Sequence, residues 1–354
     1  MAIRTRPDGI AASLACLPPG PWCFVVLIIL LLIGSAAVIY LACDSFVNGV
    51  EWIGHRLSIS QTATGTILAA FGTALPESVV TLVATAFGHT DAQRELGGGA
   101  ALGGPLALAT IAYGAVGMAL LANRRRLGRA SNPVVEVEGR RLSYDQLWFL
   151  AVFVVKIGLG LVLYRYKPLL GFVFLAVYGI YVWTELRRDS DADQGDREPL
   201  KIRPRHPDPP LGWALIQVVA ALVIIFLASR TFVAQLGQFG PWLGLSPQLT
   251  ALLLSPIATE LPETMNALIW VRQGKERLAL ANISGAMMIQ ATVPTAFGLF
   301  FTPWLLSREL VIAAVVTMVA VAVLFAMFRK GNVRGRGLAA VALLYGAFAA
   351  GIIA

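Results

Sequence analysis

The sequence predicts an all-α membrane protein with ten transmembrane helices, arranged as two inverted repeats of five helices each. Two observations support this fold class. The 354 residues are 57% hydrophobic and only 14% charged, with a mean hydropathy of +0.72, which is outside the usual range of soluble domains. In addition, LLLSPIATELPETMN at 252–266 is echoed by LAAFGTALPESVV around Glu77. The composition predicts a membrane protein, and the echo predicts an internal repeat.

The two stretches belong to a longer match. At the offset that places Glu77 on Glu263, the alignment runs without a gap from Phe46 on Phe232 to Gly99 on Gly285. A lone Leu-Pro-Glu would occur by chance in many membrane proteins, but a match of this length is a strong signal of a tandem repeat.

The apolar runs set the boundaries of the repeats. Residues 1–21 form an N-terminal tail whose apolar part is too short and too broken for a cleaved signal. A mixed-charge, proline-rich linker at 187–210 separates the first repeat, 22–186, from the second, 211–354. Each predicted span is close to the twenty residues that a bilayer requires. The spans are expected at 22–42, 59–87 (interrupted at Pro76), 97–121, 147–164, 168–186, 211–229, 247–271, 278–300, 308–328 and 337–353.

Basic residues predict the orientation. The connections after the first, third, fifth, seventh and ninth spans carry most of the Lys and Arg, so they are expected in the cytoplasm and both termini outside. The first of these connections is expected to hold Asp44, Glu51 and His55. Because each repeat has an odd number of spans, the second repeat must be inverted, an arrangement typical of transporters with a midplane site. We expect the bacterial inner (plasma) membrane.

Charge and cysteine content exclude other classes. The net charge of +8 falls in short segments between apolar runs, where it sets topology, so we expect membrane lipid but no nucleic acid as a partner. Cys16, Cys23 and Cys43 have no paired spacing, which predicts neither disulfides nor a zinc site. The sequence does not predict an oligomeric state.

Glu77, Glu260 and Glu263 are the candidate functional residues. An uncompensated Glu near a bilayer centre costs about 2.5 to 3.5 kcal/mol on insertion scales, so these side chains need a partner or a function. Pro76, Pro256 and Pro262 lie beside them, and each removes a backbone donor and frees carbonyl oxygens. Carboxylates at breaks in membrane helices predict a cation site.

The motifs around Glu77 and Glu263 resemble the signature motifs of a known family. GTALPE around Glu77 and ATELPE around Glu263 are similar to the GTSLPE signatures of the two alpha repeats of the sodium/calcium exchanger family, in the cation/calcium antiporter superfamily. The resemblance covers roughly 44–121 and 230–300 and implies secondary antiport of calcium against sodium or protons. Inorganic cations would be the substrates, with no enzyme activity and no cofactor.

The resemblance also implies further ligands. It places hydroxyl ligands on Thr73 and Thr259 and carbonyl ligands on Ala70 and Pro256, beside the acidic ligands Glu77 and Glu263. In the second repeat, ANISGAMMIQ keeps Asn282 and Gly285 of the family's GNxxGSN segment and puts Gln290 at the ligand position that follows it.

The chain departs from the family pattern in each repeat. Gly104 is the first-repeat partner of Gln290 and has no side chain to offer. The family serine three residues before each glutamate is Ala74 in the first repeat and Glu260 in the second. The first half therefore has fewer oxygens than the pattern expects and the second has an additional carboxylate, which leaves ion identity and stoichiometry open.

Two charged residues have several interpretations. Glu260 is an extra ligand, a proton carrier or a vestibule residue. Lys156 is the only basic residue deep in an apolar run, and it either snorkels to an interface or stays buried. We hypothesise that Lys156 reaches Glu260 and serves as a fixed positive charge beside the site.

Four functions compete. The leading one is calcium antiport driven by sodium or protons, and the second is monovalent cation/proton antiport. An intramembrane hydrolase is disfavoured because the sequence has no HExxH, no Ser/His pair on facing spans and no nucleotide-binding loop. A channel or a non-transporting scaffold is the fourth.

Overall fold

The chain folds into a helical membrane protein, of which the computed structural model describes most residues. For a few residues inside helices, Glu77 among them, only the backbone is described. The described residues are 21–59, 63–87, 101–126, 128, 133–136, 139–162, 165–187, 198–206, 208–242, 253, 256 and 259–353. Nearly all of the N-terminal tail, residues 188–197 and 207 of the linker, and most of the first half of the predicted seventh span lie outside them.

Eight of the described helices are long and apolar enough to cross a bilayer. They are α1 (Pro21–Arg56), Ala101–Asn123 (containing η2, Leu108–Ala112, and α5, Tyr113–Asn123), α6 (Gly139–Leu161), α7 (Lys167–Arg187), α8 (Leu211–Trp242), α12 (Glu276–Phe301), α13 (Arg308–Phe328) and α14 (Gly335–Ile353). The shorter helical segments are η1 (Thr64–Ala69), α3 (Ala70–Phe87) and α11 (Leu261–Gln273).

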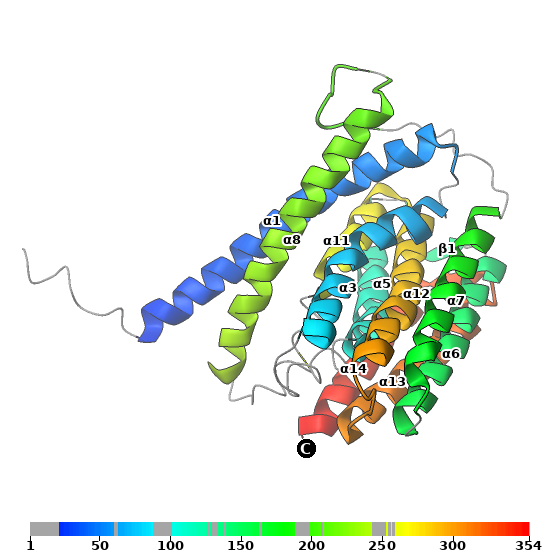
Figure 1. Cartoon of the computed structure of the whole chain (residues 1–354). Coiled ribbons are helices and arrows are strands. Elements are labelled where there is room, and N and C mark those ends of the chain that lie inside the picture. Colours follow the sequence, from blue (N-terminus) through cyan, green and yellow to red (C-terminus); the bar gives the residue numbers. More distant parts are fainter. Residues whose placement is uncertain are drawn as a thin grey trace, which may run out of the picture.

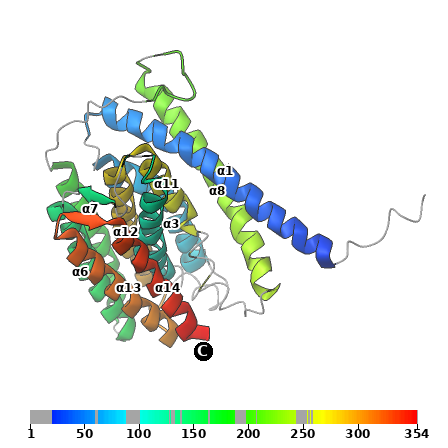
Figure 2. The same ribbon diagram turned by 180° about the vertical axis from the view of Figure 1, so that it is seen from behind.

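The long helices α1 and α8 lie side by side at one edge of the molecule in both views (Figures 1 and 2). They run antiparallel, because Gly49 packs on Val218 while Arg56, further along α1, bonds to Pro209, which precedes α8. The polar residues beyond the first apolar run continue α1 as helix instead of forming the expected connection. The Gln217 amide explains part of this extension, since it donates to Ser45 O (2.7 Å) and Asn48 Oδ1 (2.9 Å).

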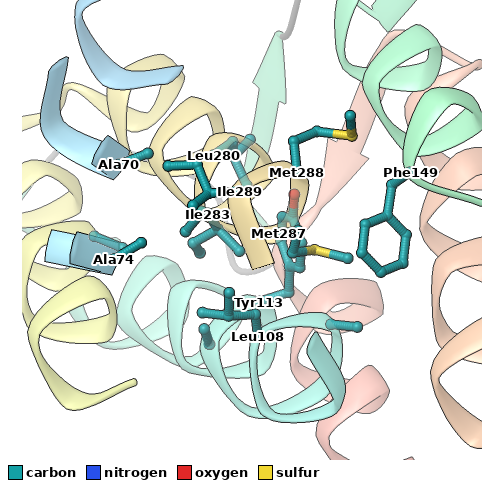
Figure 3. Packing of buried hydrophobic residues seen from close by; sticks show 14 of the residues in the cluster. Ala70, Ala74, Leu108, Tyr113, Phe149, Leu280, Ile283, Met287, Met288 and Ile289 are labelled. Atoms are coloured by element: carbon teal, nitrogen blue, oxygen red, sulfur yellow. The ribbon is translucent and has the colours of Figure 1, made fainter. Parts of the chain in front are cut away.

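Helix α12 forms the centre of the core, and residues on all its sides are buried. Figure 3 shows Ala70 and Ala74 of α3 on one side of α12, and Phe149 of α6 on the other. Small residues allow the backbones to approach closely, as expected for membrane helices. A Cβ on Gly285 would lie 2.0 Å from Thr66 O of η1, which gives a physical reason for the glycine in ANISGA.

The helix contacts come in reciprocal pairs. Helices in corresponding positions of the two repeats meet as α1 with α8 and as α6 with α13. The contact of α3 with α12 is matched by that of α11 with α5, and the contact of α7 with α12 is matched by that of α14 with α5. Reciprocity of this kind is what a two-fold relation between two halves produces.

Apart from the longer α1, the structure differs from the expected elements in four places. Helix α8 continues to Trp242, although its span was expected to end at 229. Helix α3 continues through Pro76 without a break, and the irregular segment is the π-helix η1 before it. Helix α6 begins at Gly139, so Arg140 and Arg141 are helical and not in a loop. Two short strands, β1 (Val134–Glu136) and β2 (Asn332–Arg334), pair antiparallel with Val135 opposite Val333, so the fold is mostly and not entirely helical.

Candidate functional site

Glu263 lies in the first turn of α11, which begins directly after Glu260 and carries Pro262 near its start. Proline at this position removes only a donor that has no partner within the helix, and the positive end of the helix dipole favours a carboxylate there. Glu263 is 1% exposed, and it lies beside Thr73 of the first repeat. Its Oε2 atom has no hydrogen-bond partner among the described residues. Helices from both repeats therefore meet at this carboxylate.

Glu260 forms the other half of the site with Gln290 of α12. The Gln290 amide Nε2 lies 2.8 Å from each oxygen of the Glu260 carboxylate and donates to it. The Thr259 hydroxyl lies 3.4 Å from Glu260 Oε1 and 3.3 Å from Pro256 O. Pro256 O also accepts from the Glu260 backbone at 3.1 Å, so local hydrogen bonds occupy the carbonyl that the resemblance assigns to an ion.

Gly104 provides the space for this pair. A Cβ there would lie 2.6 Å from Gln290 Oε1 and 2.8 Å from Glu260 Oε1, so the backbone of the first repeat touches both side chains. Ala74, the first-repeat partner of Glu260, is fully buried. The larger polar residues of one repeat therefore fill volume that the small residues of the other leave open.

The first-repeat residues lie on the η1–α3 segment. Thr73 is buried, and its hydroxyl is also 3.0 Å from Ala69 O. Ala70 is buried at the junction of η1 and α3, and Glu77 lies on α3 with a side chain outside the described set. Because α3 is continuous, Pro76 cannot donate to the carbonyl of Gly72, which is therefore the carbonyl that loses its usual helical donor. A role for Ala70 O as a ligand stays a prediction.

Two asparagines near Glu263 received no role from the sequence. The Asn282 amide is 3.4 Å from Glu263 O, and its Oδ1 has no hydrogen-bond partner in the described part of the chain. Asn266, one turn after Glu263, is fully buried, and neither its oxygen nor its nitrogen has such a partner. Buried amides normally find partners, so these atoms mark a polar region inside the protein where a ligand could supply them. A polar residue three positions after the glutamate, on the same helix face, is the signal that could have identified Asn266.

Lys156 of α6 lies next to the same cluster. Its ammonium donates to Gln290 O, and the side chain of that residue holds Glu260. Lys156 therefore binds the backbone of Gln290, and Glu260 binds the side chain of the same residue. Lys156 is fully buried, so the interpretation that it snorkels to an interface is wrong.

Together these groups favour binding of a hard cation. Glu260 and Glu263 are three residues apart at the start of α11 and repel each other in a poorly hydrated setting, and a cation between them would relieve that repulsion. Carboxylate, amide and hydroxyl oxygens are the ligands that calcium prefers. Among the described residues, no group of three or more His, Cys, Asp or Glu side chains comes together.

The chain matches a family across both halves. The profile described as sodium/calcium exchanger protein matches residues 27–187 and 213–354. The inner membrane protein YrbG of Escherichia coli (strain K12) is 26% identical over 328 residues, which cover 90% of this chain and 93% of the relative. The candidate antiporter CaxA of Alkalimonas amylolytica is 25% identical over 277 residues, covering 78% of this chain and 81% of CaxA.

Solved structures share the fold. The sodium-calcium exchanger NCX_Mj soaked with 2.5 mM Na⁺ and 10 mM Sr²⁺ superposes with a TM-score of 0.71 at 18% identity, covering 91% of this chain and 98% of that one. The same exchanger soaked with zero Na⁺ and Ca²⁺ gives a TM-score of 0.69 and covers 93% of this chain and 99% of the other. At this identity the likeness shows the fold alone.

Proposed function

Because the chain belongs to the sodium/calcium exchanger protein family, whose members are transporters and not enzymes, we propose that it moves calcium across the membrane against sodium or protons. The transported cations are the substrates, and no cofactor takes part. The residues proposed to hold them are Glu77, Glu263, Thr73, Thr259, Gln290, Glu260 and the carbonyls of Ala70 and Pro256. The fold and the integral membrane character of the chain agree with this activity.

One observation carries the proposal: the fully enclosed Glu263 carboxylate, which the first repeat reaches through Thr73. A buried carboxylate in a membrane protein is costly unless a cation or a donor compensates it. Glu263 Oε2 and Asn282 Oδ1 both lack a hydrogen-bond partner among the described residues, although the carbonyl of Glu263 and the side chain of Asn282 are in contact. Buried carboxylate and amide oxygens without hydrogen-bond donors suit a divalent cation.

We propose ten spans in two inverted repeats, 22–186 and 211–354, with a midplane site between them. The reciprocal helix contacts support the inversion. Both termini would face outward and the 187–210 linker the cytoplasm of a bacterium, with the chain in the inner membrane. Cysteines placed at Ser190 and Ala354, in a chain whose native cysteines are replaced, should react from opposite sides. Labelling of both positions from one side would contradict the inverted plan.

A monovalent cation/proton antiporter is the second candidate. Ala74 and Gly104 supply no side-chain oxygens to the first half of the site, which lowers the number of ligands available to calcium. Sodium needs fewer oxygens, so this deficit is the observation that favours the alternative.

Flux through proteoliposomes separates the two. Vesicles holding purified protein are loaded with sodium, or set to an acidic interior, and the uptake of radioactive calcium is followed after dilution. We expect calcium accumulation that collapses when the opposing gradient is dissipated. Sodium uptake against protons with no calcium movement under either gradient would establish the monovalent antiporter instead.

A further inference from the structure

Lys156 occupies a closed site built from three helices. The side chain rises from α6, and its ammonium donates to Ala101 O at 2.6 Å and to Gln290 O at 3.3 Å. Ala101 belongs to the first repeat and Gln290 to the second. The rings of Phe153 and Trp304 flank the ammonium, with centroids 5.4 and 5.9 Å away, at cation–π range. Carbonyl oxygens and aromatic faces hold this charge in the manner in which a protein holds a small cation.

A second buried lysine provides a contrast. Lys167 begins α7, and its ammonium donates to Pro303 O and Trp304 O, both at 3.1 Å. Its position at the first residue of a span gives it a purely structural explanation at the membrane boundary. Lys156 lies five residues before the end of α6 and is fully enclosed, so the boundary does not explain it.

Gln290 connects Lys156 to the candidate site. Its backbone carbonyl receives the ammonium, and its side-chain amide donates to both Glu260 oxygens at 2.8 Å. Gly104 closes against the Glu260 and Gln290 side chains from the first repeat. Gln290 therefore holds the positive charge of Lys156 with its backbone carbonyl and the negative charge of Glu260 with its side-chain amide.

We propose that Lys156 takes the place of one transported cation by neutralising Glu260 through this cluster. The inference rests on the proposed antiport. Glu260 then offers the ions oxygen atoms without an uncompensated charge, which leaves Glu77 and Glu263 as the two charges available to transported ions. One divalent ion or two monovalent ions then balance the same site, so the loaded site crosses the membrane without net charge in both directions.

The test is the voltage dependence of exchange. Proteoliposomes with fixed sodium and calcium gradients are clamped at several potentials with potassium and valinomycin, and calcium accumulation at equilibrium is measured. For the parent chain we expect accumulation that does not depend on voltage. Lys156→Met frees Glu260 to bind a third monovalent ion, so accumulation should change about tenfold for each ~59 mV, the value for one charge.

Two further variants and one control keep the test decisive. Lys156→Met combined with Glu260→Ala removes both charges and should return exchange to voltage independence. Glu260→Gln alone leaves an excess positive charge, so the half-saturating calcium concentration should rise at least tenfold, even where Lys156→Met does not fold. Lys167→Met is the matched control, because it removes a buried ammonium with two carbonyl partners and should leave the coupling unchanged.

Different results would overturn the proposed antiport and the proposed role of Lys156. Absence of calcium exchange by the parent chain under both gradients would overturn the proposed function. Calcium exchange that depends on voltage in the parent, or that stays voltage-independent in Lys156→Met, would overturn the role of Lys156 alone. An unchanged half-saturation in Glu260→Gln would overturn it as well.

Discussion

The two repeats contribute to one site with unequal side chains. Where the second repeat has Glu260 and Gln290, the first has Ala74 and Gly104 at the aligned positions. The small and the large residues fit together, because Gly104 packs directly on Glu260 and Gln290. Duplicated halves therefore need not stay symmetric in chemistry: the shared fold keeps the volume of the site constant while the polar groups concentrate on one side.

Both repeats have a glutamate at the same aligned position, Glu77 in the first and Glu263 in the second. Loss of either glutamate should have the largest effect. Glu77→Gln and Glu263→Gln keep the side-chain volume but each removes a charge from the ion's ligand shell, so either should reduce calcium flux to the level of empty vesicles. Glu309→Gln, at an exposed position at the start of α13, is the control and should exchange normally. Transport by either site variant at the parent rate would mean that the halves do not share one site.

The repeat alignment explains how much of this could be predicted. Apolar runs identified the spans well where a helix is apolar along its whole length, as in α13, which begins at Arg308 and ends at Phe328 as expected. They failed for α1, whose second half mixes polar residues with buried apolar ones and is held by tertiary partners such as Gln217 and Lys201. Hydropathy cannot register contacts that residues far along the chain provide.

The limits at the site have the same origin. The aligned motifs pointed to Glu263, Thr73 and Gln290; the structure places Thr73 beside Glu263 and joins Gln290 to Glu260, and their roles as ligands stay predictions. They did not identify Asn266, because no repeat symmetry marks it: its aligned partner is Val80. They placed a helix break at Pro76 that is absent, since surrounding helices can accommodate a proline within a continuous membrane helix.

Adding one methyl group at Gly104 tests whether the site needs the small residues of the first repeat. Gly104→Ala would place a Cβ 2.6 Å from Gln290 Oε1 and 2.8 Å from Glu260 Oε1, displacing both side chains. We expect the rate of calcium exchange to fall about tenfold or more, since about 1.4 kcal/mol of misplacement is enough for that factor. Gly158→Ala is the matched control, because no atom lies within 4 Å of its added Cβ. Equal rates for the two variants would show that the volume at Gly104 is not used.

The close contact between the halves can be tested separately from transport. In Gly285→Ala the new Cβ would lie 2.0 Å from Thr66 O, a backbone atom that cannot move alone, so α12 must shift away from η1. Overpacking of this kind costs about 1 to 3 kcal/mol. Thermal unfolding in detergent should show a lower midpoint than for the parent and for Gly179→Ala, whose Cβ meets nothing. A midpoint equal to that of Gly179→Ala would contradict the tight crossing.

The smallest expected effect compares the paired hydroxyls. Thr73 lies beside Glu263 of the other repeat, whereas Thr259 lies beside Glu260 within its own repeat. Valine preserves the shape of threonine and removes only the hydroxyl, so each change should cost about one hydrogen bond, of order 1 kcal/mol, or a few-fold in apparent calcium affinity. The losses should be unequal, since Glu263 is available to the ion while the Gln290 amide already satisfies both oxygens of Glu260. Calcium-dependent flux should therefore weaken more in Thr73→Val than in Thr259→Val. The reverse order would place the main ion contact at the Glu260 half and would change which repeat dominates the site.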